Sequence, residues 1–153
     1  MSKILAIGFK GKNNSSGLLA EQLSSDHLLL TNSFAGLRKD ISSIEKEYGQ
    51  AVMFGVDKTL TSNVRIEKLA SLDSCKAASV LDLAKIAACL KDAGIEAVIS
   101  DKATRYLCNE AYWHVLEKFS GRAVFIHIPT IKYVDKSFMD KMKTAFRSFE
   151  KCF

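Results

Sequence analysis

The chain has 153 residues, of which 48% are hydrophobic and 25% are charged, and its formal net charge is +5. This balance is typical of a soluble globular protein and excludes a disordered segment. A chain of this length can bury roughly two thirds of its unfolded surface, so we expect one domain over residues 1–153.

The first apolar run follows Met1 and is only a handful of residues long before Lys10. It is too short for a signal sequence or a membrane span. The four cysteines form no C-x-x-C pair and have no regular spacing, which argues against a zinc site or a disulfide framework. We therefore expect a cytoplasmic protein with reduced thiols, no metal and no membrane partner.

Short apolar runs alternate with amphipathic segments along the whole chain. The pattern predicts a strand at 4–8, a helix at 17–23, a strand at 27–30 and a helix at 34–48 that ends at Gly49. A strand at 51–56 follows. Residues 64–72 suit a strand at first and then drift towards helical spacing. The remaining elements are helices at 80–93, 106–119 and 137–149, and strands at 97–99 and 123–128.

This alternation predicts the fold class. Helices between short apolar strands are typical of an α/β protein, here one three-layer domain with a mostly parallel twisted sheet and helices on both faces. We find no repeat, low-complexity tract or linker.

The basic residues near the C-terminus raise the question of nucleic-acid binding. Acidic residues interrupt them, however, and the apolar residues between them recur at helical spacing: Phe138, Met142, Ala145, Phe146 and Phe149. The lysines are therefore the solvated face of an amphipathic helix, and we expect no nucleic-acid partner.

In open α/β sheets, ligands bind beyond the carboxyl ends of the strands. Segments 8–16, 55–63 and 100–105 follow predicted strands. The first is rich in glycine, asparagine and serine, but it does not match a phosphate loop. Ala6 stands where the first glycine should lie upstream of Gly11-Lys12, and Asn13 replaces the hydroxyl residue. A nucleotide site is poorly supported.

Cys108 and His127 are the two parts of a possible thiol nucleophile. Cys108 lies in the first turns of a predicted helix, for which Asp101 or Thr104 is the expected cap, and the helix dipole would favour its thiolate. His127 lies near the end of a predicted strand, from where it could act as a general base. Judged from these residues alone, a buried core cysteine and a hydrogen-bonded core histidine are the more common outcome.

Five segments resemble the pyroglutamyl peptidase I family, also called pyrrolidone carboxyl peptidases. Tyr-Leu-Cys-Asn at 106–109 is similar to the segment that carries the family's nucleophile, and Phe-Ile-His-Ile-Pro at 125–129 to the segment that carries its histidine. Val-Arg-Ile-Glu-Lys-Leu-Ala at 64–70 resembles the stretch with the catalytic glutamate. Residues 91–95 and 7–9 also fit. The resemblance covers nearly the whole chain in order.

This resemblance implies a cysteine exopeptidase that hydrolyses the amide bond after an N-terminal pyroglutamyl residue. It implies Cys108 as nucleophile, His127 as base and Glu67 as the carboxylate that orients His127. The substrate would be a peptide or small amide, no cofactor is implied, and we expect a homo-oligomer. The implied substrate-binding residues are Phe9, Gly55, Tyr106 and Leu107.

The chain also departs from the family pattern. It is shorter between Glu67 and residue 80, where the family carries a long loop with an active-site arginine, for which Lys76 is a poor substitute. Lys12 stands where the family has a second aromatic ring. The family's glycine-rich turn and its glycine and threonine before the cysteine segment are replaced at 56–58 and 104–105. Two alternatives therefore stay open: a non-catalytic or altered-substrate relative, and a small-molecule-binding α/β module.

Overall fold

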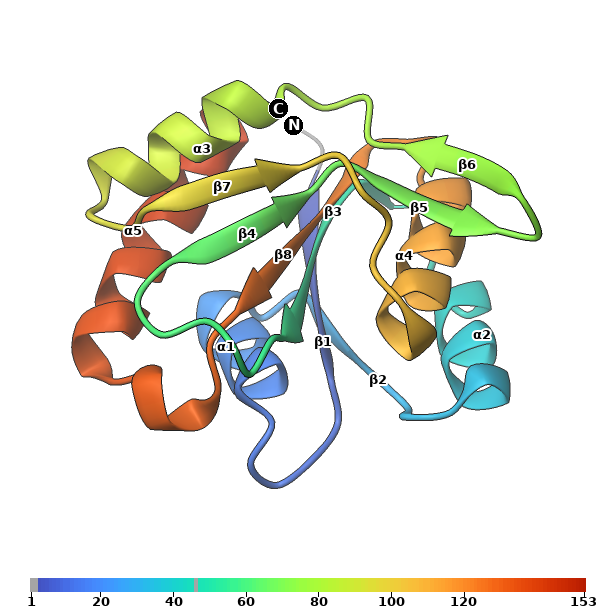
Figure 1. Cartoon of the computed structure of the whole chain (residues 1–153), viewed down its shortest axis with the longest axis horizontal. Coiled ribbons are helices and arrows are strands. Elements are labelled where there is room, and N and C mark those ends of the chain that lie inside the picture. The colour runs from blue at the N-terminus through green and yellow to red at the C-terminus, as the bar shows by residue number, and fades with distance from the viewer. Residues whose placement is uncertain (1–2, 46) are drawn as a thin grey trace.

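The computed structural model describes residues 3–45 and 47–153 (Figure 1). Strands and helices alternate along most of this length. In chain order they are β1 (Lys3–Phe9), α1 (Ser15–Leu23), β2 (His27–Leu30), α2 (Phe34–Ser42), β3 (Tyr48–Val56), β4 (Val64–Glu67), β5 (Leu69–Leu72), β6 (Cys75–Ala78), α3 (Leu83–Asp92), β7 (Ala97–Ser100), α4 (Tyr106–Lys118), β8 (Ala123–Ile128), a short 3₁₀ turn η1 (Ile131–Tyr133) and α5 (Lys136–Cys152).

Six strands form one sheet in the order β2-β1-β3-β8-β4-β7. The first four are parallel to one another, β4 runs antiparallel to β8, and β7 is parallel to β4. The amino end of β4 therefore lies on the same side of the sheet as the carboxyl ends of β1, β3 and β8. This confirms the predicted α/β class with a mostly parallel sheet.

Helices cover both faces of the sheet, as Figure 1 shows. One apolar cluster joins the sheet to α1, α3 and α5, and a second joins it to α2 and α4. The five apolar positions predicted for the last helix are all buried in the first cluster. The basic residues of α5 are thereby left on its outer side, as the sequence pattern predicted.

The predicted helix at 34–48 was too long. The helix α2 ends at Ser42, and Tyr48 and Gly49 instead open β3, where Tyr48 is in register with Lys3 of β1. Strand pairing has overridden the helical spacing of the apolar residues here. Residue 46, inside the predicted helix, lies outside the described residues.

Residues 64–72 form two strands rather than one element. After β4 the chain enters a small hairpin of β5 and β6, of which β6 was not predicted from the sequence. Asp73 and Ser74 form its turn with φ values of 49° and 67°. Two consecutive positive φ values are the mark of a two-residue hairpin turn, for which aspartate is well suited. The hairpin lies between Glu67 and residue 80, the region that we expect from the sequence to be shorter than in the family that it resembles.

The glycine-rich segment after β1 is explained by close packing. A Cβ atom at Gly8 would collide with the backbone of Ser16 and Gly17 in the first turn of α1. The hydroxyl of Ser16 accepts a hydrogen bond from the Phe9 amide at 3.1 Å, and Ser15 donates to the Pro129 carbonyl at 2.7 Å. These residues join α1 to β1 and to the end of β8. Among the described residues, no helix is long and apolar enough to cross a membrane.

Candidate active site

Strands β3, β8 and β4 bring a set of polar side chains together on the face that α4 covers. His127 of β8 is in register with Gly55 of β3 on one side and with Arg65 of β4 on the other. Residues directly opposite on neighbouring strands point to the same face, and so do residues two apart on one strand. Arg65, Glu67 and His127 therefore share one face, although 60 residues separate Glu67 from His127.

Glu67 and His127 form a buried pair. The distance from His127 Nδ1 to Glu67 Oε1 is 2.8 Å, and the side chains are only 1% exposed for Glu67 and 4% for His127. An ionised carboxylate only accepts hydrogen bonds, so we assign the proton to Nδ1, which donates to Glu67. This tautomer leaves the lone pair on Nε2, the nitrogen that can act as a base.

Arg65 is a site residue that our sequence reasoning missed. Its Nε donates to Glu67 Oε1 at 2.6 Å, and its Nη1 lies 2.7 Å from Asp57 Oδ2. Its Nη2 approaches His127 Nδ1 at 3.1 Å, but that nitrogen already donates to Glu67 and cannot also accept. One guanidinium thus lies against two carboxylates and the imidazole. The two-residue spacing of Arg65 and Glu67 on a strand was a usable signal.

Asp57 is held in its charged form. Partial burial alone would raise the pKa of Asp57, but hydrogen bonds from Thr59 and from Arg65, together with the Arg65 charge, lower that pKa to about 2. The Thr59 hydroxyl and amide both donate to Asp57 Oδ1, at 2.7 and 2.8 Å. A second carboxylate is therefore ionised beside the site at neutral pH.

The Cys108 sulfur lies above Gly55, the neighbour of His127 in the sheet. A Cβ atom at Gly55 would lie 3.3 Å from Cys108 Sγ and 2.7 Å from the Phe125 ring. Because adjacent strands are about 4.8 Å apart, Cys108 and His127 occupy neighbouring positions on one face. The structure gives Cys108 no hydrogen bond to a described residue, so the sulfur and the imidazole are adjacent but not bonded.

Cys108 is a neutral thiol in the free protein. Burial raises its pKa to about 11, and the charges of Glu67 and Asp57 act in the same direction. This corrects the expectation that the helix N-terminus would favour a thiolate. The two nearby carboxylates oppose the helix dipole, and desolvation penalises the charged sulfur.

The start of α4 also differs from the prediction. Neither Asp101 nor Thr104 caps the helix; Arg105 is at the cap position and makes no side-chain cap hydrogen bond. Tyr106, the first helical residue, has a φ of +60°, which is unusual for an aromatic residue, and its side chain is 80% exposed. The first-turn amides of a helix have no acceptor within the helix, and here no side chain caps them.

Two contacts fix α4 over the sheet. Asn109 donates to the Ser71 carbonyl at 2.6 Å and accepts from the Ser71 amide at 3.0 Å, which ties the helix to the hairpin. The fully buried Tyr112 donates its hydroxyl to the Glu67 carbonyl at 2.8 Å. Asn109 thus positions α4 against β5, and Tyr112 positions it against β4.

An open cleft of 820 Å³ lies over this site. Its lining comes from the end of β3 and the segment after it, from the segment that leads into α4 and the first turn of that helix, and from one residue each of β4 and β8. These are residues 56–58, residues 103–108, Arg65 and His127. The cleft therefore brings together Cys108, His127, Tyr106 and Leu107, while Glu67 lies buried behind His127. Gly55 is not in the lining and lies beneath the sulfur.

Phe9 does not line this cleft. It is 4% exposed and belongs to the apolar cluster against which Leu107 and Cys108 pack. Its strand, β1, is separated from β8 by β3, and its ring is covered. The ring of Phe9 is part of the core that supports Cys108 and Leu107, and its role in substrate binding stays a prediction. Lys12 and Lys76 are exposed and also lie outside the lining.

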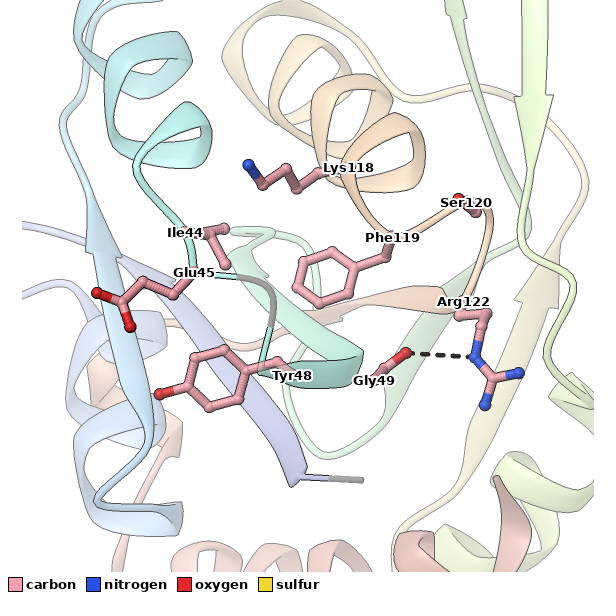
Figure 2. A pocket seen from close by; sticks show the side chains of 8 residues that line it. All are labelled: Ile44, Glu45, Tyr48, Gly49, Lys118, Phe119, Ser120 and Arg122. Atoms are coloured by element: carbon pink, nitrogen blue, oxygen red, sulfur yellow. Dashed lines mark hydrogen bonds between the residues drawn. The ribbon is translucent and has the colours of Figure 1, made fainter. Parts of the chain in front are cut away.

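A second hollow of 290 Å³ lies at the opposite end of the strands, where β3 and β8 begin (Figure 2). The rings of Tyr48 and Phe119 face it, and Arg122 Nε donates to the Gly49 carbonyl at 3.2 Å. No cysteine or histidine is among its lining residues. The described residues also contain no cluster of three or more His, Cys, Asp or Glu side chains that could hold a metal ion. The larger cleft is therefore the candidate active site.

Comparison with known proteins gives a consistent result. Residues 60–150 match the family model described as pyroglutamyl peptidase, a span of more than half of the chain that includes Glu67, Cys108 and His127. The chain belongs to the pyroglutamyl peptidase family. Comparison with curated protein sequences gives no match.

Solved structures of this family share its fold with the chain. The pyrrolidone carboxyl peptidase from Thermococcus litoralis is 21% identical with a TM-score of 0.74, over 99% of this chain and 96% of that one. The pyroglutamyl peptidase I from Bacillus amyloliquefaciens is 17% identical with a TM-score of 0.74, over 96% and 98%. The pyrrolidone carboxyl peptidase from Fervidobacterium islandicum is 18% identical with a TM-score of 0.77, over the full length of both chains.

Proposed function

We propose that this chain is a cysteine exopeptidase that hydrolyses the amide bond after an N-terminal pyroglutamyl or related residue. Cys108, His127 and Glu67 are the catalytic residues in this proposal. The observation that carries it is the buried 2.8 Å pair of His127 and Glu67, which opens onto the cleft where the Cys108 sulfur lies. A base held in one tautomer beside a thiol is the arrangement that thiol acyl transfer needs.

The reaction begins from the neutral thiol. As Cys108 Sγ attacks the acyl carbon, its proton passes to His127 Nε2, and the charge of the imidazolium is stabilised by Glu67 at Nδ1. The carbonyl electrons move to oxygen, and the uncapped backbone amides of the first turn of α4 are the donors that can bind this oxyanion.

The intermediate then collapses in two steps. The C–N bond breaks as His127 returns the proton to the leaving amine, which leaves a thioester on Cys108. A water molecule gives a proton to His127 and attacks the thioester; the C–S bond breaks, and the thiol regains its proton. In this proposal no step needs a metal or cofactor, and Tyr106 and Leu107 contact the acyl group from one side of the cleft.

A specific observation favours a second candidate, a non-catalytic or altered-substrate relative. Cys108 has a raised pKa and is not bonded to His127, and Phe9 does not reach the cleft. An apolar contact missing from a substrate pocket removes about 1–3 kcal/mol of discrimination. We therefore expect pyroglutamyl hydrolysis to be weak. A small-molecule-binding module remains the third candidate.

The test is hydrolysis of a fluorogenic pyroglutamyl amide by the purified protein. We expect slow release of the fluorophore that Cys108→Ala abolishes and that Cys75→Ala, at an exposed cysteine on the hairpin, leaves unchanged. Glu67→Gln should lower kcat while the variant still folds, because the imidazolium loses its counter-charge. If no amide in a panel of aminoacyl amides is cleaved, the non-catalytic relative is favoured. Light scattering tests the homo-oligomer, which is also a prediction.

A further inference from the structure

The cleft carries unequal charge along its lining. Three cations line it, Lys58, Arg65 and Arg105, against one carboxylate, Asp57. Arg65 is bound to Asp57 and to the buried Glu67, so its one positive charge is already offset by two carboxylates. Lys58 and Arg105 are exposed, and neither makes an ion pair with a residue that the structure describes. The cleft therefore has two positive charges without a partner among the described residues.

These two cations come from different walls of the cleft. Lys58 belongs to the segment between β3 and β4, and Arg105 immediately precedes α4, three residues before Cys108. The floor is closed beneath the sulfur by Gly55 and the Phe125 ring. A substrate whose acyl carbon meets Cys108 must extend its leaving group away from this floor, towards solvent, where the two exposed side chains lie.

We propose that the cleft selects substrates with a carboxylate on the leaving-group side of the scissile amide. Such a substrate has an acidic residue, or a free C-terminal carboxylate, directly after the pyroglutamyl or related residue. This inference rests on the proposed function and adds the substrate class to it. Lys58 and Arg105 are the specificity-determining residues, and they act by long-range attraction rather than by a rigid clamp.

The effect has a limited size and a definite salt dependence. Exposed charges interact weakly, so a preference of about 3- to 10-fold is expected for two cations. The Debye length is about 8 Å at physiological ionic strength and about 3 Å at 1 M salt, so the preference should largely disappear at high salt.

The first experiment compares kcat/KM for three matched substrates: pyroglutamyl-glutamate amide, pyroglutamyl-glutamine amide and pyroglutamyl-glutamine with a free carboxylate. The two acids should exceed the neutral amide in the wild type, and their relative rates distinguish an acidic side chain from a C-terminal carboxylate as the favoured group. The double variant Lys58→Gln with Arg105→Gln should lose the preference. Its control is Lys85→Gln with Arg147→Gln, which also removes one lysine and one arginine charge, but from α3 and α5 on the opposite face of the sheet.

A second experiment does not depend on peptidase activity. Cys108 is alkylated with anionic iodoacetate and with neutral iodoacetamide at about pH 9, where lysine and arginine stay charged, and the modified peptides are quantified by mass spectrometry. At Cys108, the ratio of the iodoacetate rate to the iodoacetamide rate should fall about 3- to 10-fold in the double variant Lys58→Gln with Arg105→Gln. It should stay unchanged in the control variant Lys85→Gln with Arg147→Gln. The exposed Cys75 serves as the internal reference.

The outcomes separate this inference from the proposed function. Equal hydrolysis of acidic and neutral substrates, with an unchanged alkylation ratio, overturns the inference and leaves the peptidase function standing. If no pyroglutamyl substrate is cleaved, the proposed function fails, and the alkylation ratio alone decides whether Lys58 and Arg105 attract anions into the cleft. An unchanged ratio then overturns the inference as well.

Discussion

At the scale of single residues, the site is a balance between one guanidinium and two carboxylates beside a thiol. Arg65 binds both Glu67 and Asp57, yet the remaining negative charge and the burial of Cys108 keep the proton on sulfur. The same Glu67 that can stabilise an imidazolium at His127 therefore opposes a thiolate at Cys108. The arrangement favours proton transfer during attack over a preformed ion pair.

The alkylation rate of Cys108 tests this directly. Because burial and two carboxylates raise the pKa of Cys108 to about 11, the thiolate fraction at neutral pH is small. We expect iodoacetamide to react slowly with Cys108 below about pH 8 and the rate to rise steeply with pH up to about 11. Peptide mass spectrometry measures this, with Cys75 as the exposed reference. A plateau of fast labelling in mild acid would instead reveal a thiolate–imidazolium pair.

Asp57 should contribute to stability in one pH window. Its pKa is lowered to about 2 in the folded protein, below its ordinary value of 3.8. The stabilisation is therefore present above the ordinary pKa and is lost as the pH falls from about 4 to about 2. Urea unfolding should show wild type more stable than Asp57→Asn at about pH 6, with the difference shrinking in that acidic window. If the difference in unfolding free energy between the two proteins stays the same from about pH 6 down to about pH 2, the result contradicts the ion pair with Arg65.

At the scale of secondary-structure elements, the position of the cysteine depends on how α4 is held. No side chain caps the helix, so its first turn is fixed by contacts that two later residues make. Asn109 binds the Ser71 backbone through two hydrogen bonds, and Tyr112 bonds to the Glu67 carbonyl. The helix that carries Cys108 and the strand that carries the carboxylate are thereby joined directly.

Asn109→Ala should loosen this junction. It leaves the amide and carbonyl of Ser71 without their partners, and an unsatisfied, partly buried pair costs about 1–3 kcal/mol. We expect the free energy of unfolding, measured in urea, to fall by about that amount. Asn109→Asp is the matched control, since it keeps the acceptor but not the donor and should lie between wild type and alanine. Equal stability of all three proteins would show that the contact does not matter.

Different parts of the molecule could be predicted from sequence to different degrees. The strands β1, β3 and β8 are continuous apolar runs and the apolar face of α5 has a clear helical period, so these elements were predicted nearly correctly. The hairpin strand Cys75–Ala78 was missed because lysine and alanine have little strand preference. Arg65 was missed because its place beside His127 depends on the antiparallel register of β4 and β8, which local patterns do not encode; its two-residue spacing from Glu67 was the one local signal.

At the scale of the whole molecule, two helical layers share one sheet. The layer of α1, α3 and α5 stabilises the fold on the face away from the cleft, and the layer of α2 and α4 carries the site. Positive charge lies both on the solvated side of α5 and at the cleft, and only the charge at the cleft enters our functional proposals.

Phe149 should be a large contributor to global stability. Its side chain is fully buried, with its ring at 5.9 Å from Phe146 and 5.7 Å from Phe153. Truncating a buried phenylalanine to alanine typically costs about 3–5 kcal/mol, a large part of the roughly 5–15 kcal/mol of an ordinary domain. We expect urea unfolding of Phe149→Ala to show a loss of this size, whereas exposed Lys151→Ala stays within about 0.5 kcal/mol of wild type. A loss below about 1 kcal/mol would show that α5 is not well packed.

The tight turn at Asp73 and Ser74 has a consequence for how this fold can change its length. Both residues lie at the tip of the hairpin, and β5 is tied to α4 below the tip by Asn109. Lengthening a loop costs little chain entropy, only about 0.6 kcal/mol for each doubling. The tip is thus a natural junction at which extra segments can be gained or lost while the framework of the site stays in place. Variation in chain length among relatives can be concentrated there, and new segments grafted at this point would extend over the protein without disturbing its core.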